Sequence, residues 1–334
     1  MPTIAEAIRH GQREITRQEG ITFARLLDEY ERVWWVVERH IQRYETQIAA
    51  AIEAGETVNP SWLRRQVWYR ELQASIDAEL VRFNRQALGT IHGSQAAAVG
   101  IAAESASMVA AAVSINPGIV GRVNASAFER WVSALRPGSP LQQVVDGYGD
   151  RIRDSLVKHL TDGIATGEGP RAILRRVRQD VGPTAIDGRL QTAIRTETMR
   201  AFRGGLKDQL GAFPEGVISG YRWAASLSTR TCPACIAMHG RIFREYPMTQ
   251  HPACRCVVTP VVSERYAPPR QFGPTGPEWF DGLSEDKQRE ILPPAHFELY
   301  RSGVPITDMV RVKRSRTWGG SVQVKPASAL RGAS

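Results

Sequence analysis

The stretches TCPAC at residues 231–235 and HPACRC at residues 251–256 contain every cysteine of this 334-residue chain. Their spacing is Cys-x2-Cys followed by His-x2-Cys-x-Cys. Zinc prefers thiolate and imidazole ligands, and a Cys-x2-Cys turn can point two thiolates at one metal ion. A closed shell of four such ligands leaves no position for water, so the pattern predicts a structural metal site.

Five side chains are candidates for the four ligand positions. Because Cys-x-Cys is a tighter spacing than usual, one of the last three candidates is expected to lie outside the ligand shell. The favoured shell is the four cysteines, or the same set with His251 replacing one of the final two. Arg230 and Arg255 lie beside the ligands and would offset the negative charge of the thiolates. The candidates are Cys232, Cys235, His251, Cys254 and Cys256.

Two other states of the cysteines stay open. The first residues lack the basic-then-apolar pattern of a signal peptide, so we expect synthesis in a reducing cytoplasm. Clustered cysteines in that compartment more often bind metal than form disulfides. The alternatives to zinc are disulfides formed late in an extracellular particle, and inert buried thiols.

The basic charge of the chain is concentrated in two regions. The net charge is +9. Residues 181–266 carry 11 basic and 6 acidic side chains, and residues 301–334 carry 7 and 1. A nearby polyanion is compatible with this distribution. The candidate nucleic-acid contacts in the tail are Arg311, Lys313, Arg314, Arg316 and Lys325.

The N-terminal half has the apolar periodicity of helices. Apolar residues recur at steps of three and four, which predicts long amphipathic helices. The alanine-rich segment 94–115 is long enough to span a bilayer, but alanine and serine contribute little transfer energy, so a buried or oligomer-facing helix is expected. The predicted helices are 21–48, 61–83, 94–115, 125–135, 141–163, 171–181 and 185–210.

The pattern changes near Gly211 to short segments rich in β-formers. Strands are predicted at 217–225, 241–243 and 257–262. A proline- and glycine-rich linker follows, then helices at 278–292 and 297–310, and a basic tail that is extended, or disordered when alone. The predicted fold class is α+β. The predicted divisions are a helical assembly domain 1–180, a small mixed module 181–266 with the Cys/His knot, and a linker, short helices and basic tail 267–334.

Two features invite a catalytic interpretation. Glu197 and Arg200 form an i, i+3 pair that is expected on the polar side of a helix, with Arg195 at the edge of its apolar stripe. A solvated helix face with one structural arginine and an Arg/Glu catalytic pair are both open. His239 could be a nuclease base, but a turn or packing role is the simpler interpretation because no orienting partner is identifiable.

The order of five motifs resembles the phage Mu F-like minor head protein, or phage head morphogenesis, family. The resemblance covers roughly 150–262, and a later extension from Glu278 to Gly303 also fits. It implies a structural role for Arg195, Glu197, Arg222, Trp223, Arg230 and Arg255. The motifs are IRTET at 194–198, YRW at 221–223, RTCPAC at 230–235, HGRIF at 239–243 and HPACRC at 251–256.

The resemblance implies a minor, non-catalytic component of a tailed-phage head that acts near the portal in head assembly and in packaging or ejection of DNA. The implied partners are the portal protein, the major capsid protein and packaged double-stranded DNA bound without sequence preference. The protein would be made in the host cytoplasm and end in the virion, inside the capsid or at the portal vertex. A homo-oligomer is possible, and no stable membrane insertion is expected. The alternatives are a zinc-stabilised DNA-binding protein or nuclease, and an effector enzyme of the toxin type.

Overall fold

The computed structural model describes residues 3–120, 125–132, 140–166, 168–266, 273–315 and 319–331. The chain divides into two compact units. The first, here called the Cys/His unit, comprises Met1–Gln18, Gln95–Ala134 and Arg195–Ser334. The second, here called the helical unit, comprises Glu19–Ser94 and Leu135–Ile194. The helices α1, α3 and α7 each contribute residues to both units.

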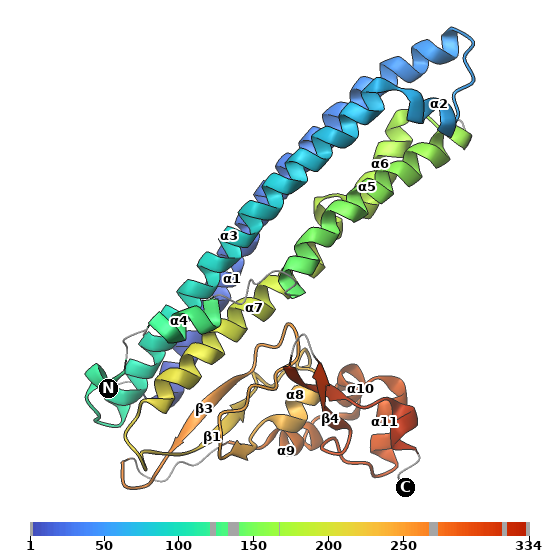
Figure 1. Ribbon diagram of the computed structural model, residues 1–334. Helices are drawn as coiled ribbons and strands as arrows, with labels where there is room; N and C mark the ends of the chain where they lie inside the picture. Colours follow the sequence, from blue (N-terminus) through green and yellow to red (C-terminus); the bar gives the residue numbers. More distant parts are fainter. Residues whose placement is uncertain are drawn as a thin grey trace. The chain divides into compact units, whose positions relative to one another are not determined.

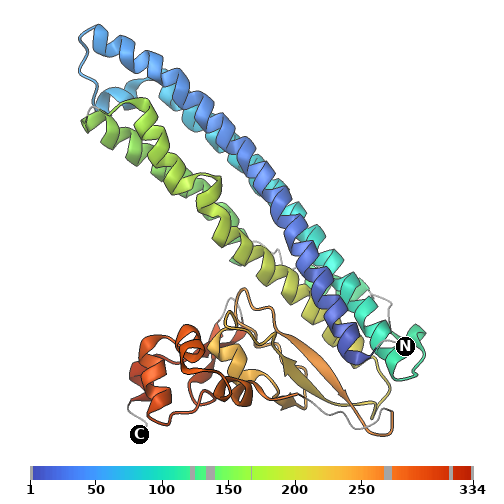
Figure 2. The ribbon, with the colours of Figure 1, turned by 180° about the vertical axis from the view of Figure 1, so that it is seen from behind.

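Long helices build the helical unit. In Figures 1 and 2, α1 and α3 run side by side in opposite directions, and α5 and α6 lie next to each other. Its core buries Leu26, Leu72 and Phe83, and the Tyr30 hydroxyl donates to the Val181 carbonyl oxygen at 2.5 Å. The helices that contribute to it are α1 (Ile4–Glu53), α2 (Pro60–Arg65), α3 (Val67–Ala112), α5 (Pro140–Thr166), α6 (Pro170–Val181) and α7 (Pro183–Gly211).

Helix α3 corrects the prediction of two separate helices at 61–83 and 94–115. The chain breaks at Gln66, and then a single helix runs from Val67 to Ala112 through Gly89 and Gly93. A glycine inside a helix costs about 1 kcal/mol relative to alanine. Burial of neighbouring apolar side chains, such as the fully buried Ile91, outweighs that cost.

The alanine-rich end of α3 lies in the core of the Cys/His unit. Ala98, Ala102 and Ala106 are fully buried there, in one cluster with Phe202 and Leu206 of α7. By length and composition α3 could cross a membrane, and half of its most apolar window is buried inside the protein. The small side chains therefore serve close helix packing within this unit.

A three-stranded antiparallel sheet in the order β2-β1-β3 is present in the described part of the Cys/His unit. The six-residue helix α8 lies between β1 and β2 in the sequence. Trp223 on β1 is fully buried and pairs in register with Val258 on β3. The elements of this region are η1 (Pro117–Ile119), α4 (Ala125–Val132), β1 (Ile218–Ala224), α8 (Pro233–Met238), β2 (Ile242–Phe243) and β3 (Val257–Val262).

The C-terminal part of the Cys/His unit is folded. The predicted helix 278–292 is two short helices separated at Gly282, and Figure 1 shows α10 next to α11. The tail is extended, as predicted, but β4 and β5 pair into an antiparallel hairpin. The Val322 amide donates to the Thr249 carbonyl oxygen at 2.7 Å. The elements are α9 (Gly276–Asp281), α10 (Glu285–Ile291), α11 (Pro294–Arg301), β4 (Val310–Ser315), β5 (Gly319–Val324) and α12 (Ala327–Leu330).

The predicted α+β class is confirmed, with long helices in the first half and small sheets in the second. The compact units do not follow the predicted divisions 1–180, 181–266 and 267–334, because the long helices run through both units. Those divisions describe segments of sequence and stay a prediction.

Candidate metal centre

The first knuckle of the centre is the start of helix α8. Cys232 is the N-cap residue, with an extended backbone, and Pro233 occupies the first helical position, where proline needs no amide donor. The Cys235 amide donates to the Cys232 sulfur at 3.4 Å. This turn places both sulfurs on the same side of the helix start. The Cys-x2-Cys spacing therefore brings the two sulfurs within 4.8 Å of each other.

The second knuckle is the loop before β3. Ala253 has a φ of 59°, in the left-handed region, and its amide donates to the Thr196 hydroxyl at 2.9 Å. The Cys256 amide donates to the Cys254 sulfur at 3.4 Å, two residues earlier. The strained backbone at Ala253 is held by a side chain of α7.

A buried arginine of α7 holds the same loop. The Arg203 side chain is 4% exposed, and its guanidinium donates to the carbonyl oxygens of Cys254 at 2.6 Å and Cys256 at 2.9 and 2.7 Å. Arg203 was not predicted from the sequence, and Thr196 entered only as part of the IRTET motif at 194–198. The seven-residue step between them, which places both on one face of a helix, was the available signal.

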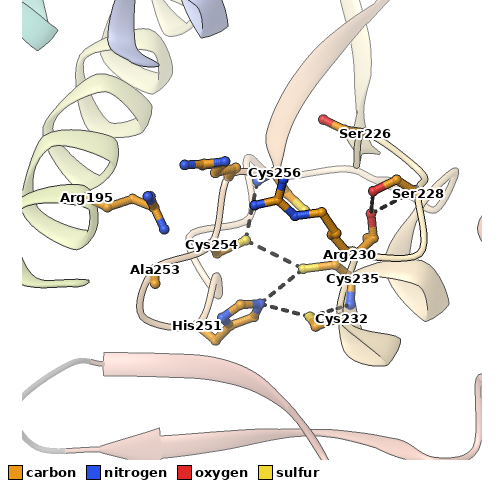
Figure 3. A pocket seen from close by; sticks show the side chains of 12 residues that line it. Arg195, Ser226, Ser228, Arg230, Cys232, Cys235, His251, Ala253, Cys254 and Cys256 are labelled. Carbon is orange, nitrogen blue, oxygen red and sulfur yellow. Dashed lines mark hydrogen bonds between the residues drawn. The ribbon is translucent and has the colours of Figure 1, made fainter. Parts of the chain in front are cut away.

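The five candidate side chains converge in two overlapping groups. The His251 Nε2 atom lies 3.1 Å from the Cys232 sulfur and 3.2 Å from the Cys235 sulfur, and the Cys235 and Cys254 sulfurs are 3.5 Å apart (Figure 3). Cys232, Cys235 and His251 form one group whose ligand atoms lie within 4.8 Å of one another, and Cys235, Cys254 and Cys256 form the other. Cys235 belongs to both groups.

The geometry fits a small tetrahedral ion. Zinc at its usual bond lengths separates two sulfurs by about 3.8 Å and a sulfur from a nitrogen by about 3.6 Å. The observed distances are slightly shorter than these. His251 Nδ1 lies 2.7 Å from the Pro252 carbonyl oxygen. Since Nδ1–H is the donor in that contact, loss of the second ring proton would free the lone pair of Nε2, which faces the sulfurs.

The cysteines are free in this structure. The 3.5 Å between the Cys235 and Cys254 sulfurs exceeds the disulfide bond length of about 2.0 Å. The distance therefore favours two thiols that share a metal ion over a disulfide bond between them.

The electrostatics of the centre favour thiolates at two of its sulfurs. Hydrogen bonds from Cys235 and His251 lower the pKa of Cys232 to about 5, although burial opposes the shift. Hydrogen bonds from Cys235 and Cys256 lower the pKa of Cys254. Burial lowers the pKa of His251, but hydrogen bonds and the charges of Cys232 and Cys254 outweigh it and raise the value to about 10. Metal binding has to displace the imidazolium proton.

The expectation that Glu197 lies on a polar helix face is wrong. Glu197 is 2% exposed, and the Gln95 amide donates to its carboxylate at 3.0 Å. Burial raises the pKa of Glu197, against the opposing charge of Arg200 and the hydrogen bond from Gln95. The carboxylate is therefore part of the packing between α3 and α7. Arg195, two residues earlier, lines a pocket beside the metal centre.

Several predicted residues surround the centre without belonging to its ligand set. Trp223 packs in one buried cluster with Cys235, Cys254 and Cys256. The Arg222 guanidinium donates to the Gly273 carbonyl oxygen at 3.3 Å. The Arg230 side chain extends over the centre (Figure 3), and the exposed Arg255 lies between two candidate ligands.

His239 has a role in loop packing. Its Nδ1 accepts a hydrogen bond from the Ala225 amide at 2.9 Å. Burial and the charge of Arg222 lower the pKa of His239. The imidazole thus joins the end of α8 to the loop after β1, which matches the packing interpretation.

The candidate nucleic-acid residues lie on or beside the C-terminal hairpin. Arg311, Lys313 and Arg314 are exposed on β4, and Lys325 is half-buried after β5. Arg316 lies outside the described residues. The described members of this set do not line the pocket at the metal centre.

Comparison with known proteins gives one match. The model of the family described as Phage Mu protein F like protein matches residues 154–259. No curated protein and no solved structure shows a significant match. The matched residues contain all five candidate ligands together with Thr196 and Arg203 of α7. The predicted resemblance is therefore confirmed for this segment, and residues 154–259 are similar to the phage Mu protein F-like family.

Proposed function

We propose that this protein is a non-catalytic component of a phage head that acts in head morphogenesis, and that a zinc ion stabilises its Cys/His unit. The observation that carries the proposal is the coincidence of two findings. The family match covers residues 154–259, and the same residues bring five metal-binding side chains together. The family suggests phage head morphogenesis and an association with the virion.

The ligand set that the contacts favour is Cys232, Cys235, His251 and Cys254. Each of these atoms lies within 3.5 Å of at least one other member of the set. Cys256 is the fifth candidate, and its amide hydrogen bond to the Cys254 sulfur gives it a supporting role. A zinc ion in this shell would cross-link the start of α8 to the loop before β3, and its binding energy would add to the folding energy of the unit.

The partners follow from the family and the charge distribution. We propose contacts with the portal protein and the major capsid protein, and non-specific contacts with packaged double-stranded DNA. The site of action would be the capsid interior or the portal vertex, after synthesis in the host cytoplasm. The exposed basic residues of β4 and the net charge of +9 support a polyanionic neighbour.

A zinc-stabilised DNA-binding protein without an assembly role is the second candidate. The exposed cations Arg311, Lys313 and Arg314 on one strand favour it. A nuclease would need a base near its substrate, and the contact of His239 with the Ala225 amide supports a packing role for this imidazole instead.

The experiment is co-assembly with the phage's own portal and major capsid proteins. The wild-type chain should sediment with assembled heads at a fixed stoichiometry, and the Cys235→Ser variant should be lost from them. The matched control is Arg244→Gln, an exposed residue of the same unit. Absence of the wild-type chain from purified heads, with DNA binding retained, would instead support the second candidate.

A further inference from the structure

The outer face of helix α6 carries a row of three arginines. Arg171, Arg175 and Arg178 are all exposed, and they occupy positions i, i+4 and i+7 of this twelve-residue helix. Residues at these spacings lie on one side of a helix, one above the other. Helix α6 therefore presents three guanidinium groups to solvent in a single line, here called the arginine row.

The opposite face of α6 packs into the helical unit. Ile173 is 1% exposed and belongs to the core of that unit. Asp180 lies 3.6 Å from His159 Nε2 of α5, the helix next to α6 in Figures 1 and 2, and Arg176 pairs with Glu168 at 2.8 Å. At 3.6 residues per turn, Ile173 and Asp180 lie about half a turn away from the arginine row. The row therefore points away from α5.

The arginine row has no counterion within the described part of the chain. No hydrogen bond, ion pair or ring contact joins any of its three side chains to another described residue. Elsewhere in the same unit, the exposed Arg32 pairs with Glu29, three residues earlier on α1. That position holds Ala172 before Arg175, and Arg175 itself before Arg178. The usual pairing along a helix is therefore missing from the row.

The arginine row does not serve the stability of α6 itself. Like charges three and four residues apart repel each other and destabilise a helix. Arg171 also lies in the first turn, where the helix dipole disfavours a cation, and that turn contains no acidic residue. An anionic partner on the row would remove both unfavourable effects.

We propose that the arginine row of α6 binds the phosphate backbone of double-stranded DNA. The row is about 10 Å long, and one DNA strand presents about three phosphates over that length. Guanidinium groups bind phosphate oxygens through two parallel hydrogen bonds, and such contacts need no particular base sequence. The choice of DNA as the anion rests on the proposed function, whereas the charge and its arrangement are properties of α6 alone.

This surface is separate from the basic C-terminal hairpin. Helix α6 belongs to the helical unit, whereas Arg311, Lys313 and Arg314 lie on β4 of the Cys/His unit. Each phosphate contact adds its own contribution to the salt dependence of DNA binding. Substitutions in α6 therefore report on the arginine row independently of β4.

The test uses the full-length protein and a short fluorescein-labelled DNA duplex, with binding measured by fluorescence anisotropy over a range of salt concentrations. The row variant removes three positive charges from α6, and the control removes three from α1 and α3 of the same unit. The row variant carries Arg171→Gln, Arg175→Gln and Arg178→Gln. The control carries Arg25→Gln, Arg70→Gln and Arg85→Gln, all at exposed positions.

The row variant should bind the duplex about thirtyfold more weakly than the wild type, at about threefold for each exposed contact. The slope of log K against log salt should decrease in magnitude by about 2.7, which is about 0.9 for each lost phosphate contact. The control should stay within about twofold of the wild type with an unchanged slope. Thermal unfolding should show the row variant to be at least as stable as the wild type, because repulsion within the row is removed.

The single substitution Arg175→Gln gives a second measurement with less disturbance of the helix. It should weaken duplex binding about threefold and decrease the magnitude of the salt slope by about 0.9. Equal weakening by the row variant and the charge-matched control would overturn the proposal, because it would indicate a general effect of net charge. Unchanged duplex binding by the row variant would also overturn it, and loss of that variant from heads would then identify a protein as the partner.

Incorporation of the wild-type chain into heads tests the proposed function separately. Absence of the wild type from heads, with duplex binding still dependent on the arginine row, would count against the assembly role and leave the DNA-binding surface in place. Normal incorporation of both variants, with equal duplex binding, would count against the surface alone.

Discussion

Arg203 donates to the carbonyl oxygen of Cys256 from both Nε, at 2.9 Å, and Nη2, at 2.7 Å. This forked contact joins helix α7 to the loop that carries three of the five candidate metal ligands. The buried guanidinium pairs with the backbone carbonyl oxygens of both Cys254 and Cys256. The position of the second knuckle is therefore set by the helix as well as by any bound ion.

Replacing Arg203 with glutamine should destabilise the Cys/His unit by about 2–3 kcal/mol, because the carbonyl oxygens of Cys254 and Cys256 would lose charged donors. Chemical denaturation measures the change. The control is Lys207→Gln, an exposed residue one turn later on the same helix. Equal stability of the two variants would show that the contact contributes nothing.

Replacing Glu197 with glutamine should change how stability depends on pH. Burial raises the pKa of the Glu197 carboxyl, so the folded state holds its proton more tightly than the unfolded state does. Stability from this group is complete below the unfolded value of 4.5 and falls as the pH rises through the folded pKa. Glu197→Gln removes that loss and can still accept the hydrogen bond from Gln95.

The measurement for Glu197→Gln is the free energy of unfolding across pH 4.5 to about pH 7.5. The free energy of unfolding of the variant should increase relative to that of the wild type as the pH rises. If the variant instead becomes less stable relative to the wild type as the pH rises, the Glu197 carboxylate is paired and has a lowered pKa. That result would contradict the raised pKa expected from its burial.

Local patterns made much of the candidate site predictable. The Cys-x2-Cys turn lies within residues 232–235, and the long helices follow from the spacing of their apolar residues. The contributions of Thr196 and Arg203 depend on a helix meeting a loop more than fifty residues later. Such contacts leave little mark on local sequence.

The continuous helix α3 and the C-terminal hairpin were harder to predict for the same reason. Gly89 and Gly93 are ordinary stop signals, and only the buried neighbours show that the helix continues. The sequence VRVKRS of β4 has the charge of a solvated tail. Its pairing partner β5 is held in the unit by Val322, which is buried with the cysteines of the Cys/His cluster. The polar-face expectation for Glu197 failed because its partner Gln95 lies on another helix.

The C-terminal hairpin should stabilise the metal centre. Val322 is 2% exposed and packs in one cluster with Cys235, Cys254 and Cys256, whereas its register partner Val312 is 53% exposed. Val322→Ala should cost about 1–3 kcal/mol of unfolding free energy. The control Val312→Ala should stay within about 0.5 kcal/mol of the wild type. Equal and small effects of both substitutions would mean that the hairpin is not packed on the centre.

Removal of metal should affect the two units differently. The helical unit has its own core around Leu26, Tyr30 and Phe83, and none of the candidate ligands lies in that unit. A chelator should therefore lower the melting temperature of the Cys/His unit and leave the helical unit protected. Hydrogen exchange resolved along the sequence measures this. Uniform loss of protection along the chain would show that the units do not unfold separately.

Elemental analysis of the purified protein tests the central claim most directly. We predict one zinc ion per wild-type chain, retention of the ion in Cys256→Ser, and its loss in Cys254→Ser and Cys235→Ser. Wild-type protein without bound zinc after purification and reconstitution under reducing conditions, with its Cys/His unit still folded, would contradict the account.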